Sequence, residues 1–285
     1  PRLNAAGRLG KADSGLHLLT ATDLGTAKTL ANELEKTNQE RKEIQEETFL
    51  EAESLLRNER DLESERVIVL ASEIFHPGVI GIAASKIVDT YHRPTVLIAL
   101  EEGIGKGSGR SIPKFNLFKA FTNCSSHLIQ FGGHAYAAGL SIAEENVDAF
   151  RDAMNEVGHQ FLTDDDLIPE IKLDTILDLS QIDFPFYKSI ALLEPFGAEN
   201  PVPSFQSQGV KIKEVKHMGK EKNHLRFRAV QGSGQIGVIA FNFASLFESL
   251  DITNEFFDIA YELHLNSWNG REKLELRLLD IRASE

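Results

Sequence analysis

Apolar residues recur along the first part of the chain with the period of a helix. Between residues 23 and 57, apolar or small side chains return every three or four positions, and no glycine or proline interrupts residues 26–66. Residues three and four apart lie on one helix face, so this pattern predicts a single long helix. About 35 residues at 1.5 Å each would span roughly 50 Å, which is typical of a connector between two domains.

Short, continuous apolar runs follow, as in buried strands. Strands are predicted at 66–71 and 95–100, with a turn and an apolar helix at 76–88 between them. This order predicts a parallel pair of strands joined by a right-handed crossover. The remaining predicted elements of this α/β layer are a strand or loop at 104–112 and helices at 116–129 and 146–158.

Strand patterns dominate the last part of the chain. A polar run at 163–166 marks a domain boundary, and a short helix is predicted near 182–193. Five strands are then predicted at 204–216, 224–230, 235–241, 256–265 and 273–281. Asn269-Gly270 is a typical hairpin turn between the last two strands. Short strands at this density predict a small barrel, for which an OB-type barrel is the leading candidate.

The composition excludes several classes of protein. Hydrophobic residues make up 42% of the 285 residues, as in folded soluble domains, and no stretch approaches the about 20 apolar residues of a membrane span. The single Cys124 excludes a disulfide framework and a multi-cysteine zinc site, and it favours a cytoplasmic location. The chain opens at Pro1 with neither an initiator Met nor a signal pattern, so we interpret it as the C-terminal part of a longer protein.

The net charge of −13 would by itself argue against a polyanionic partner, but the charges are segregated. Residues 30–66 hold twelve acids and six bases, whereas residues 103–143 hold no acid. Residues 211–228 hold seven bases and two acids. In this segment the candidate nucleic-acid-binding residues are Lys211, Lys213, Arg226 and Arg228, with Phe205 and Phe227 as candidate stacking platforms. Alternatively, both phenylalanines belong to the core and the lysines only solubilise an edge strand.

Two glycine-containing motifs lie inside the acid-free segment. In Gly105–Ser111 (GKGSGRS), the glycines would let backbone N–H groups converge on an anion, and Ser108 and Arg110 offer donors to a phosphate. In Phe131–Gly139 (FGGHAYAAG), two glycines before His134 would let the backbone approach a ligand closely. Each motif alone is also compatible with a flexible turn or a structural histidine. Their shared position favours a binding site for phosphates.

Five motifs occur in an order that resembles the RecJ family, the single-strand-specific 5′→3′ DNA exonucleases of the DHH/DHHA1 phosphoesterase superfamily. They are Arg2–Gly10 (RLNAAGRLG), His76–Ala84 (HPGVIGIAA), Gly107–Ser111 (GSGRS), Phe131–His134 (FGGH) and Pro195–Pro201 (PFGAENP). The resemblance implies an α/β lobe of DHHA1 type with a mixed sheet, preceded by a long connecting helix and followed by an all-β OB-like barrel. The implied bounds are 1–65 for the end of the DHH lobe with the helix, 66–160 for the DHHA1 domain and 161–285 for the OB-like domain.

The resemblance also implies roles for individual residues. Substrate and phosphate contacts are implied for Arg2, Asn4, Arg8, Ser108, Arg110, Gly132 and Gly133. The first three of these would lie near a cleft between two lobes. His134 would contact the scissile or terminal nucleotide.

The reaction that the resemblance implies is two-metal hydrolysis of phosphodiester bonds in single-stranded DNA, in repair and recombination. In the family a DHH lobe binds Mn²⁺ or Mg²⁺, and this chain has no Asp-His-His sequence. We therefore expect the metal ligands to lie outside this chain and the chain alone to hydrolyse nothing. The expected partners are single-stranded DNA, a single-strand-binding protein and a helicase, and no membrane.

Two other functions stay open. Phosphodiesterases for cyclic dinucleotides or short oligonucleotides also carry a Gly-Gly-His motif on a DHHA1 lobe, although the barrel and the Arg2–Arg8 motif argue against them. A non-catalytic module that binds single strands or docks a partner protein would also account for the basic segment.

Overall fold

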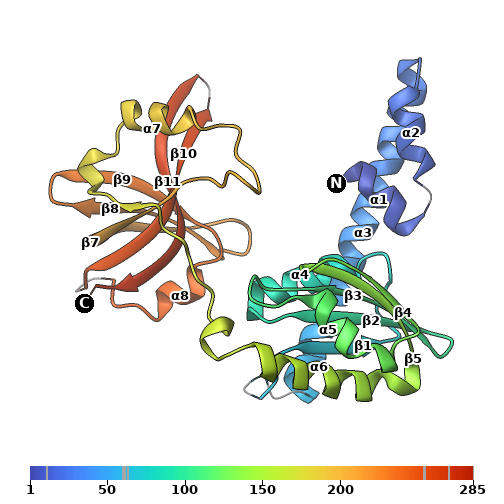
Figure 1. Ribbon diagram of the computed structural model, residues 1–285. Coiled ribbons are helices and arrows are strands. Elements are labelled where there is room, and N and C mark those ends of the chain that lie inside the picture. The colour runs from blue at the N-terminus through green and yellow to red at the C-terminus, as the bar shows by residue number, and fades with distance from the viewer. Residues whose placement is uncertain (11, 60–61, 63, 253–254, 269, 285) are drawn as a thin grey trace. The chain divides into compact units, whose positions relative to one another are not determined.

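The computed structural model describes the chain except for residues 11, 60–61, 63, 253–254, 269 and 285, and it divides into two compact units (Figure 1). The N-terminal unit comprises residues 1–169 and the C-terminal unit residues 170–285.

The predicted long helix is confirmed as α3 (Leu24–Glu59), which follows the short helices α1 (Arg2–Leu9) and α2 (Asp13–Thr20). In Figure 1 it extends from these two helices to the sheet of the N-terminal unit. Its C-terminal half buries Phe49, Ala52 and Leu56 against β1 and α4. The helix is therefore held by packing at both ends rather than by helix propensity alone.

The sheet of the N-terminal unit is mixed and has the order β1-β2-β3-β5-β4. Its strands are β1 (Ile68–Ser72), β2 (Thr95–Glu101), β3 (Ile104–Arg110), β4 (Gln130–Gly133) and β5 (Ala137–Ala143). The predicted parallel pair is confirmed as β1 and β2, joined through α4 (Ile80–Tyr91), and every other pairing is antiparallel.

Helices cover the two faces of this sheet unequally. On one face, α3 and α4 bury Leu70, Ile87 and Leu97. On the other face, α5 (Leu117–Asn123) and α6 (Val147–Phe161) build a larger core. Because α3 and α4 lie over β1, β2 and part of β3, the α4 side of β5 and β4 stays accessible to a ligand.

The free edge of β1 is closed by side chains of α6. Asn155 accepts hydrogen bonds from the N–H groups of Arg66 (2.9 Å) and Val67 (3.1 Å), and its amide donates to the Val67 carbonyl (3.0 Å). Arg151 donates through Nε to the Val69 carbonyl (2.9 Å). These bonds occupy positions that another strand would otherwise fill.

One prediction for this unit is wrong, and the structure decides between the two alternatives of another. The helix expected at 116–129 ends at Asn123 and is followed by a 3₁₀ turn, because the Ile129 N–H already bonds the Ser141 carbonyl (2.9 Å) and draws the chain into β4. Of the strand or loop predicted at 104–112, the structure shows the regular strand β3, so the backbone of the GKGSGRS segment forms no anion-binding loop. Its backbone pairs with β2 and β5, and a Cβ at Gly109 would come within 2.5 Å of Leu117, so that glycine serves core packing.

The C-terminal unit confirms the predicted barrel. Its five strands are β7 (Ser204–Met218), β8 (His224–Gln231), β9 (Gly234–Ala240), β10 (Phe257–Trp268) and β11 (Arg271–Ala283). They close through antiparallel pairing of β10 with β7, and only the β9–β11 pair in this ring is parallel. The predicted hairpin joins β10 to β11, although Asn269 of its turn lies outside the described residues.

Short elements flank the barrel strands. The strand β6 (Thr175–Ile176) adds to β7 in parallel, α7 (Phe184–Ala191) precedes the barrel, and α8 (Ala244–Glu248) connects β9 to β10. Further 3₁₀ turns lie at Ser125–His127, Glu144–Asn146, Asp165–Leu167 and Leu179–Gln181. The closed ring surrounds an apolar core with Phe205, Phe257 and Tyr261 inside it.

Candidate nucleic-acid interface

The start of α4 lies against two of the predicted phosphate ligands. Strand alternation turns Lys106, Ser108 and Arg110 toward the α4 side of the sheet. Arg110 Nη1 donates to Ser108 Oγ (3.2 Å) and to the Gly109 carbonyl (2.7 Å). A Cβ at Gly81 would come within 2.8 Å of Arg110 Nη2 and 2.9 Å of Ser108 Oγ. Close approach of the helix to this pair therefore requires a glycine at 81.

A second guanidinium adjoins this pair. Arg8 Nη1 donates to the Gly78 carbonyl (3.2 Å), just before α4 begins. Burial lowers the pKa of Arg110, and the charge of Arg8 lowers it further. In the described part of the chain, neither arginine has an ion pair with a carboxylate. Two cations without carboxylate partners among the described residues thus lie at the positive end of a twelve-residue helix, where the electrostatic environment favours an anion.

The Gly-Gly-His motif flanks an open strip of the same sheet face. Cross-strand register aligns Ser108 with Gly139, and Gly139 with Gly132. A Cβ at Gly132 would meet no atom within 4 Å, so the surface of this strip consists of backbone atoms and is open. Gly133 has φ of 143° and lies against β5, where a Cβ would come within 2.5 Å of the Ala137 carbonyl oxygen. His134 follows with an exposed imidazole and a backbone N–H bonded to the same carbonyl (2.8 Å).

The other two predicted residues of α1 lie in different surroundings. Arg2 forms an ion pair with Glu35 of α3, and Asn4 is exposed on α1. The structure thus brings Arg8, and not Arg2, into electrostatic contact with Arg110. Gly78, Gly81 and Gly139 were not among the predicted site residues. Their role depends on the crossing of α4 over β3 and on the β3–β5 register, which the sequence pattern does not contain.

A β-bulge in β7 arranges the basic residues of the barrel. Lys213 pairs with Arg228 and Lys216 pairs with Arg226, with the register shifted between them at Glu214, whose φ is 55°. In a regular strand Lys213 and Lys216 would point to opposite faces. The bulge puts both on the outer face, together with Arg226 and Arg228. Lys211 lies further along the same face and has its Nζ 4.7 Å from the centre of the exposed Phe256 ring.

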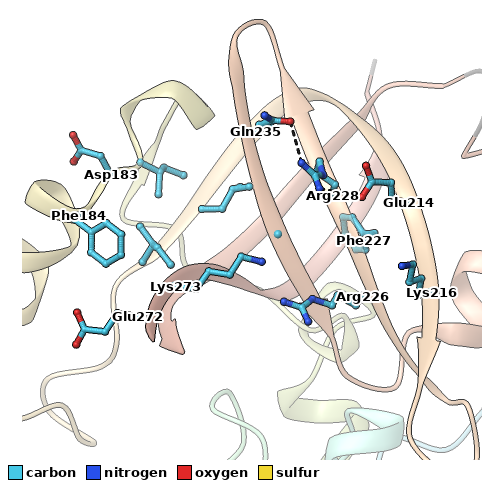
Figure 2. A pocket seen from close by; sticks show the side chains of 14 residues that line it. Asp183, Phe184, Glu214, Lys216, Arg226, Phe227, Arg228, Gln235, Glu272 and Lys273 are labelled. Carbon is cyan, nitrogen blue, oxygen red and sulfur yellow. Dashed lines mark hydrogen bonds and ion pairs between the residues drawn. The ribbon is translucent and has the colours of Figure 1, made fainter. Parts of the chain in front are cut away.

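A groove of about 730 Å³ runs over this outer face (Figure 2). It is lined by Ile182, Asp183, Phe184, Glu214, Lys216, Arg226, Phe227, Arg228, Gln235, Ile236, Gly237, Glu272, Lys273 and Leu274. The groove is less uniformly basic than the sequence implied, because Arg228 pairs with Glu214 (3.1 Å) and Arg226 pairs with the buried Glu275. Lys213 and Lys216 form no ion pair with a described residue.

The predicted stacking platforms are wrong. Phe205 and Phe227 are 2% and 3% exposed and belong to the barrel core, as the alternative interpretation held. Phe241, which directly follows β9, is instead 46% exposed. The His224 ring lies 5.3 Å and the Arg277 guanidinium 5.8 Å from its ring centre. Arg277 and Arg226 both pair with Ile239 on the outer face of the barrel, so the contact with Arg277 places Phe241 at that same face.

The described residues do not offer a ligand set for a divalent metal. No three His, Cys, Asp or Glu side chains among them are placed to hold one ion. The described helices also include none that is long and apolar enough to cross a membrane.

Two family matches divide the chain as the fold does. The DHHA1 domain matches residues 64–159, and the RecJ OB domain matches residues 173–280. The single-stranded-DNA-specific exonuclease RecJ of Bacillus subtilis is 35% identical over 287 residues, which cover 100% of this chain and 36% of that protein. RecJ of Haemophilus influenzae is 36% identical over 286 residues, covering 97% of this chain and 49% of that protein.

A solved structure agrees with these matches. The crystal structure of RecJ from Thermus thermophilus in complex with Mn²⁺ superimposes with a TM-score of 0.81 at 32% identity, covering 100% of this chain and 40% of that one. The same values of TM-score and identity hold for the complex with Mg²⁺. The chain thus spans less than half the length of these relatives. It is homologous over its whole length to part of RecJ, and it contains the DHHA1 and OB domains of that family.

Proposed function

We propose that this chain holds single-stranded DNA for a RecJ-type exonuclease that acts in DNA repair and recombination. One observation carries the proposal: at the start of α4, Arg110 bonds Ser108 and Arg8 bonds the Gly78 carbonyl, and neither arginine has a carboxylate partner among the described residues. These groups provide the charge-assisted donors and the helix terminus that a phosphate requires. The open strip of backbone at Gly132 and Gly139 beside them leaves room for a nucleotide chain.

In this proposal the DNA contacts of the N-terminal unit are divided among three groups. Arg110 and Ser108 bind one phosphate, with Arg8 on its other side. Gly132 and Gly133 let the DNA backbone lie on the sheet, and His134 contacts the scissile or terminal nucleotide. Arg2 and Asn4 stay proposed contacts near the cleft toward a second lobe.

The barrel would hold the strand farther along its length. Lys211, Lys213, Lys216 and Arg226 would contact phosphates, with Arg228 beside them. Phe241 would stack a base, because it is half exposed on the same outer face as Arg226. OB barrels bind single strands by this combination of a positive groove and aromatic platforms.

Hydrolysis itself is proposed to use Mn²⁺ or Mg²⁺ held by residues outside this chain. The two metal ions would supply an activated water and neutralise the charge of the transition state. The chain alone is then expected to bind DNA and to release no nucleotides in either metal. Release of nucleotides by the purified chain would refute this division of labour. A single-strand-binding protein and a helicase stay predicted partners, and a cytoplasmic location stays predicted.

Fluorescence anisotropy with a labelled oligothymidylate tests the phosphate site. Arg110→Ala should weaken binding about 10- to 100-fold, since hydrogen bonds to charged groups are worth about 1.5–3 kcal/mol. Lys119→Ala is the matched control, because Lys119 is an exposed cation on α5, which packs on the opposite sheet face. Binding of the control should change less than about twofold. Equal losses in both variants would show general attraction to the positive segment in place of a phosphate site.

A further inference from the structure

We propose that Glu275 is a positioning residue for DNA binding by the barrel: it holds Arg226 and Lys273 side by side so that both cations meet one phosphate in the groove. The inference rests on the proposed function, since it concerns how the groove is prepared for DNA. By its charge alone, a carboxylate in this groove would be expected to weaken the binding of DNA.

Glu275 is buried although it points outward from the barrel. Along β11, Leu274 and Leu276 face the apolar core, so Glu275 between them faces the outside. Its exposed fraction is nevertheless 0%. Three side chains donate hydrogen bonds to it: Arg226, Lys273 and Asn266. A buried, outward-facing carboxylate with three donors is the centre of a polar cluster rather than part of the apolar core.

Both oxygens of Glu275 are occupied. Oε1 accepts from Lys273 Nζ (3.0 Å) and from Arg226 Nη2, and Oε2 accepts from Asn266 Nδ2 (3.1 Å). Burial acts to raise the pKa of Glu275, but the hydrogen bonds from Asn266 and Lys273 and the charge of Arg226 outweigh it, so its pKa lies below the ordinary value. The carboxylate is therefore ionised at neutral pH and can anchor both cations.

The two cations converge on the groove. Figure 2 shows the ends of Arg226 and Lys273 pointing toward one another from β8 and β11. Both cations bond Glu275 Oε1. Without this carboxylate, the two positive charges would repel each other and their side chains would move apart. The side chains of Arg226 and Lys273 remain 42% and 59% exposed, and both line the groove. The cluster as a whole carries one net positive charge, available to a phosphate.

The backbone of β9 makes room for this arrangement. Gly237 lies between Arg228 and Glu275 in the strand register. A Cβ at this position would come within 3.3 Å of Lys273 Nζ and 3.7 Å of Glu275 Oε1. A larger side chain would displace the Lys273 head group. The sheet therefore provides a space in which the three charged groups meet.

The substitution Glu275→Gln separates positioning from simple electrostatics. If Glu275 acted only through its charge, its removal would make the groove more positive and tighten DNA binding. If it positions the two cations, removal releases them and weakens binding. We expect the variant of the full 285-residue chain to bind labelled oligothymidylate about tenfold more weakly. Binding equal to or tighter than that of the wild-type chain would overturn the proposal.

Glu272→Gln is the matched control. Glu272 lies at the groove with its carboxylate apart from Arg226 and Lys273 in Figure 2, and the change removes the same charge. This variant should bind DNA slightly more tightly, by up to about twofold, because only a surface charge is lost. Equal weakening of binding by Glu272→Gln and by Glu275→Gln would also overturn the positioning role.

A double-mutant cycle covers the case in which Glu275→Gln also lowers stability. In a chain that carries Arg226→Ala and Lys273→Ala, the additional change at 275 should alter affinity less than about twofold. A tenfold loss in that background would show that Glu275 does not act through these cations and would refute the inference. Failure of the wild-type chain to bind the oligonucleotide would refute the proposed function, whereas normal binding by Glu275→Gln refutes only the positioning role.

Discussion

Replacement of Phe241 by alanine separates base stacking from charge attraction on the barrel. The ring is 46% exposed, so about half of its apolar surface is buried and its loss should lower the stability by about 1 kcal/mol. Stacking of one base on an aromatic ring is worth about 1–3 kcal/mol. His224 and Arg277 already cover part of the ring, so we expect the lower end, a loss of about 1–2 kcal/mol. This corresponds to about 5- to 30-fold weaker binding.

The dependence of affinity on salt provides the decisive assay. The slope of log K against log salt reports the number of neutralised phosphates, at about −0.7 for each on a single strand. Phe241→Ala should lower affinity at every salt concentration and leave this slope unchanged. Arg226→Ala should lower the affinity and also reduce the slope. Phe161→Ala, at an exposed phenylalanine of α6, serves as the control. A changed slope in Phe241→Ala, or an unchanged affinity, would refute the stacking role.

Three further predictions concern stability and reactivity. Gly109→Ala should destabilise the N-terminal unit by about 1–3 kcal/mol, visible in thermal unfolding, because the new Cβ would lie 2.5 Å from Leu117. Burial, with a smaller contribution from a nearby glutamate, raises the pKa of Cys124 to about 11, so the native chain should resist thiol reagents at about pH 8 and react once unfolded. Burial acts to raise the pKa of Asp258, but hydrogen bonds from Ser284 and other donors outweigh it and the pKa is lowered. Its stabilising contribution is therefore complete above the unfolded pKa of about 3.9 and is lost as pH falls through the lower folded value. Asp258→Asn should accordingly be less stable than the wild-type chain at neutral pH and lose less stability on acidification, as measured by denaturant unfolding across the acidic range.

The sequence predicts well those elements whose apolar period is long and uninterrupted. The helix α3 has such a period over its length, and the five barrel strands are bounded by turn residues. The strands β4 and β5 escaped prediction because they consist largely of glycine and alanine, which have weak strand propensity. They form through pairing with β3, which is a tertiary effect.

The errors at the site have a common physical origin. Alternation along a strand identifies two faces but does not say which one a closed barrel turns inward, so the sequence leaves Phe205 and Phe227 compatible with both the surface and the core, and the structure shows the core. The bulge at Glu214 adds one residue and reverses the alternation beyond it, which brings Lys216 beside Arg226. Neither the inward-facing side of a strand nor the position of the bulge can be recognised from the residue types alone. The proximity of Arg8 to Arg110 likewise depends on contacts between segments about one hundred residues apart.

The hydrogen bonds of Asn155 to β1 have a consequence for self-association. Asn is one of the few side chains that offers a donor and an acceptor at the same reach, and both are used against Arg66 and Val67. Aspartate would repel the Val67 carbonyl, and leucine would leave three backbone groups of the edge unpaired. Either change would expose a template on which a second chain could add a strand. We therefore expect Asn155 to oppose self-association of the N-terminal unit through the β1 edge, which lies at the opposite end of the sheet from the Gly-Gly-His motif.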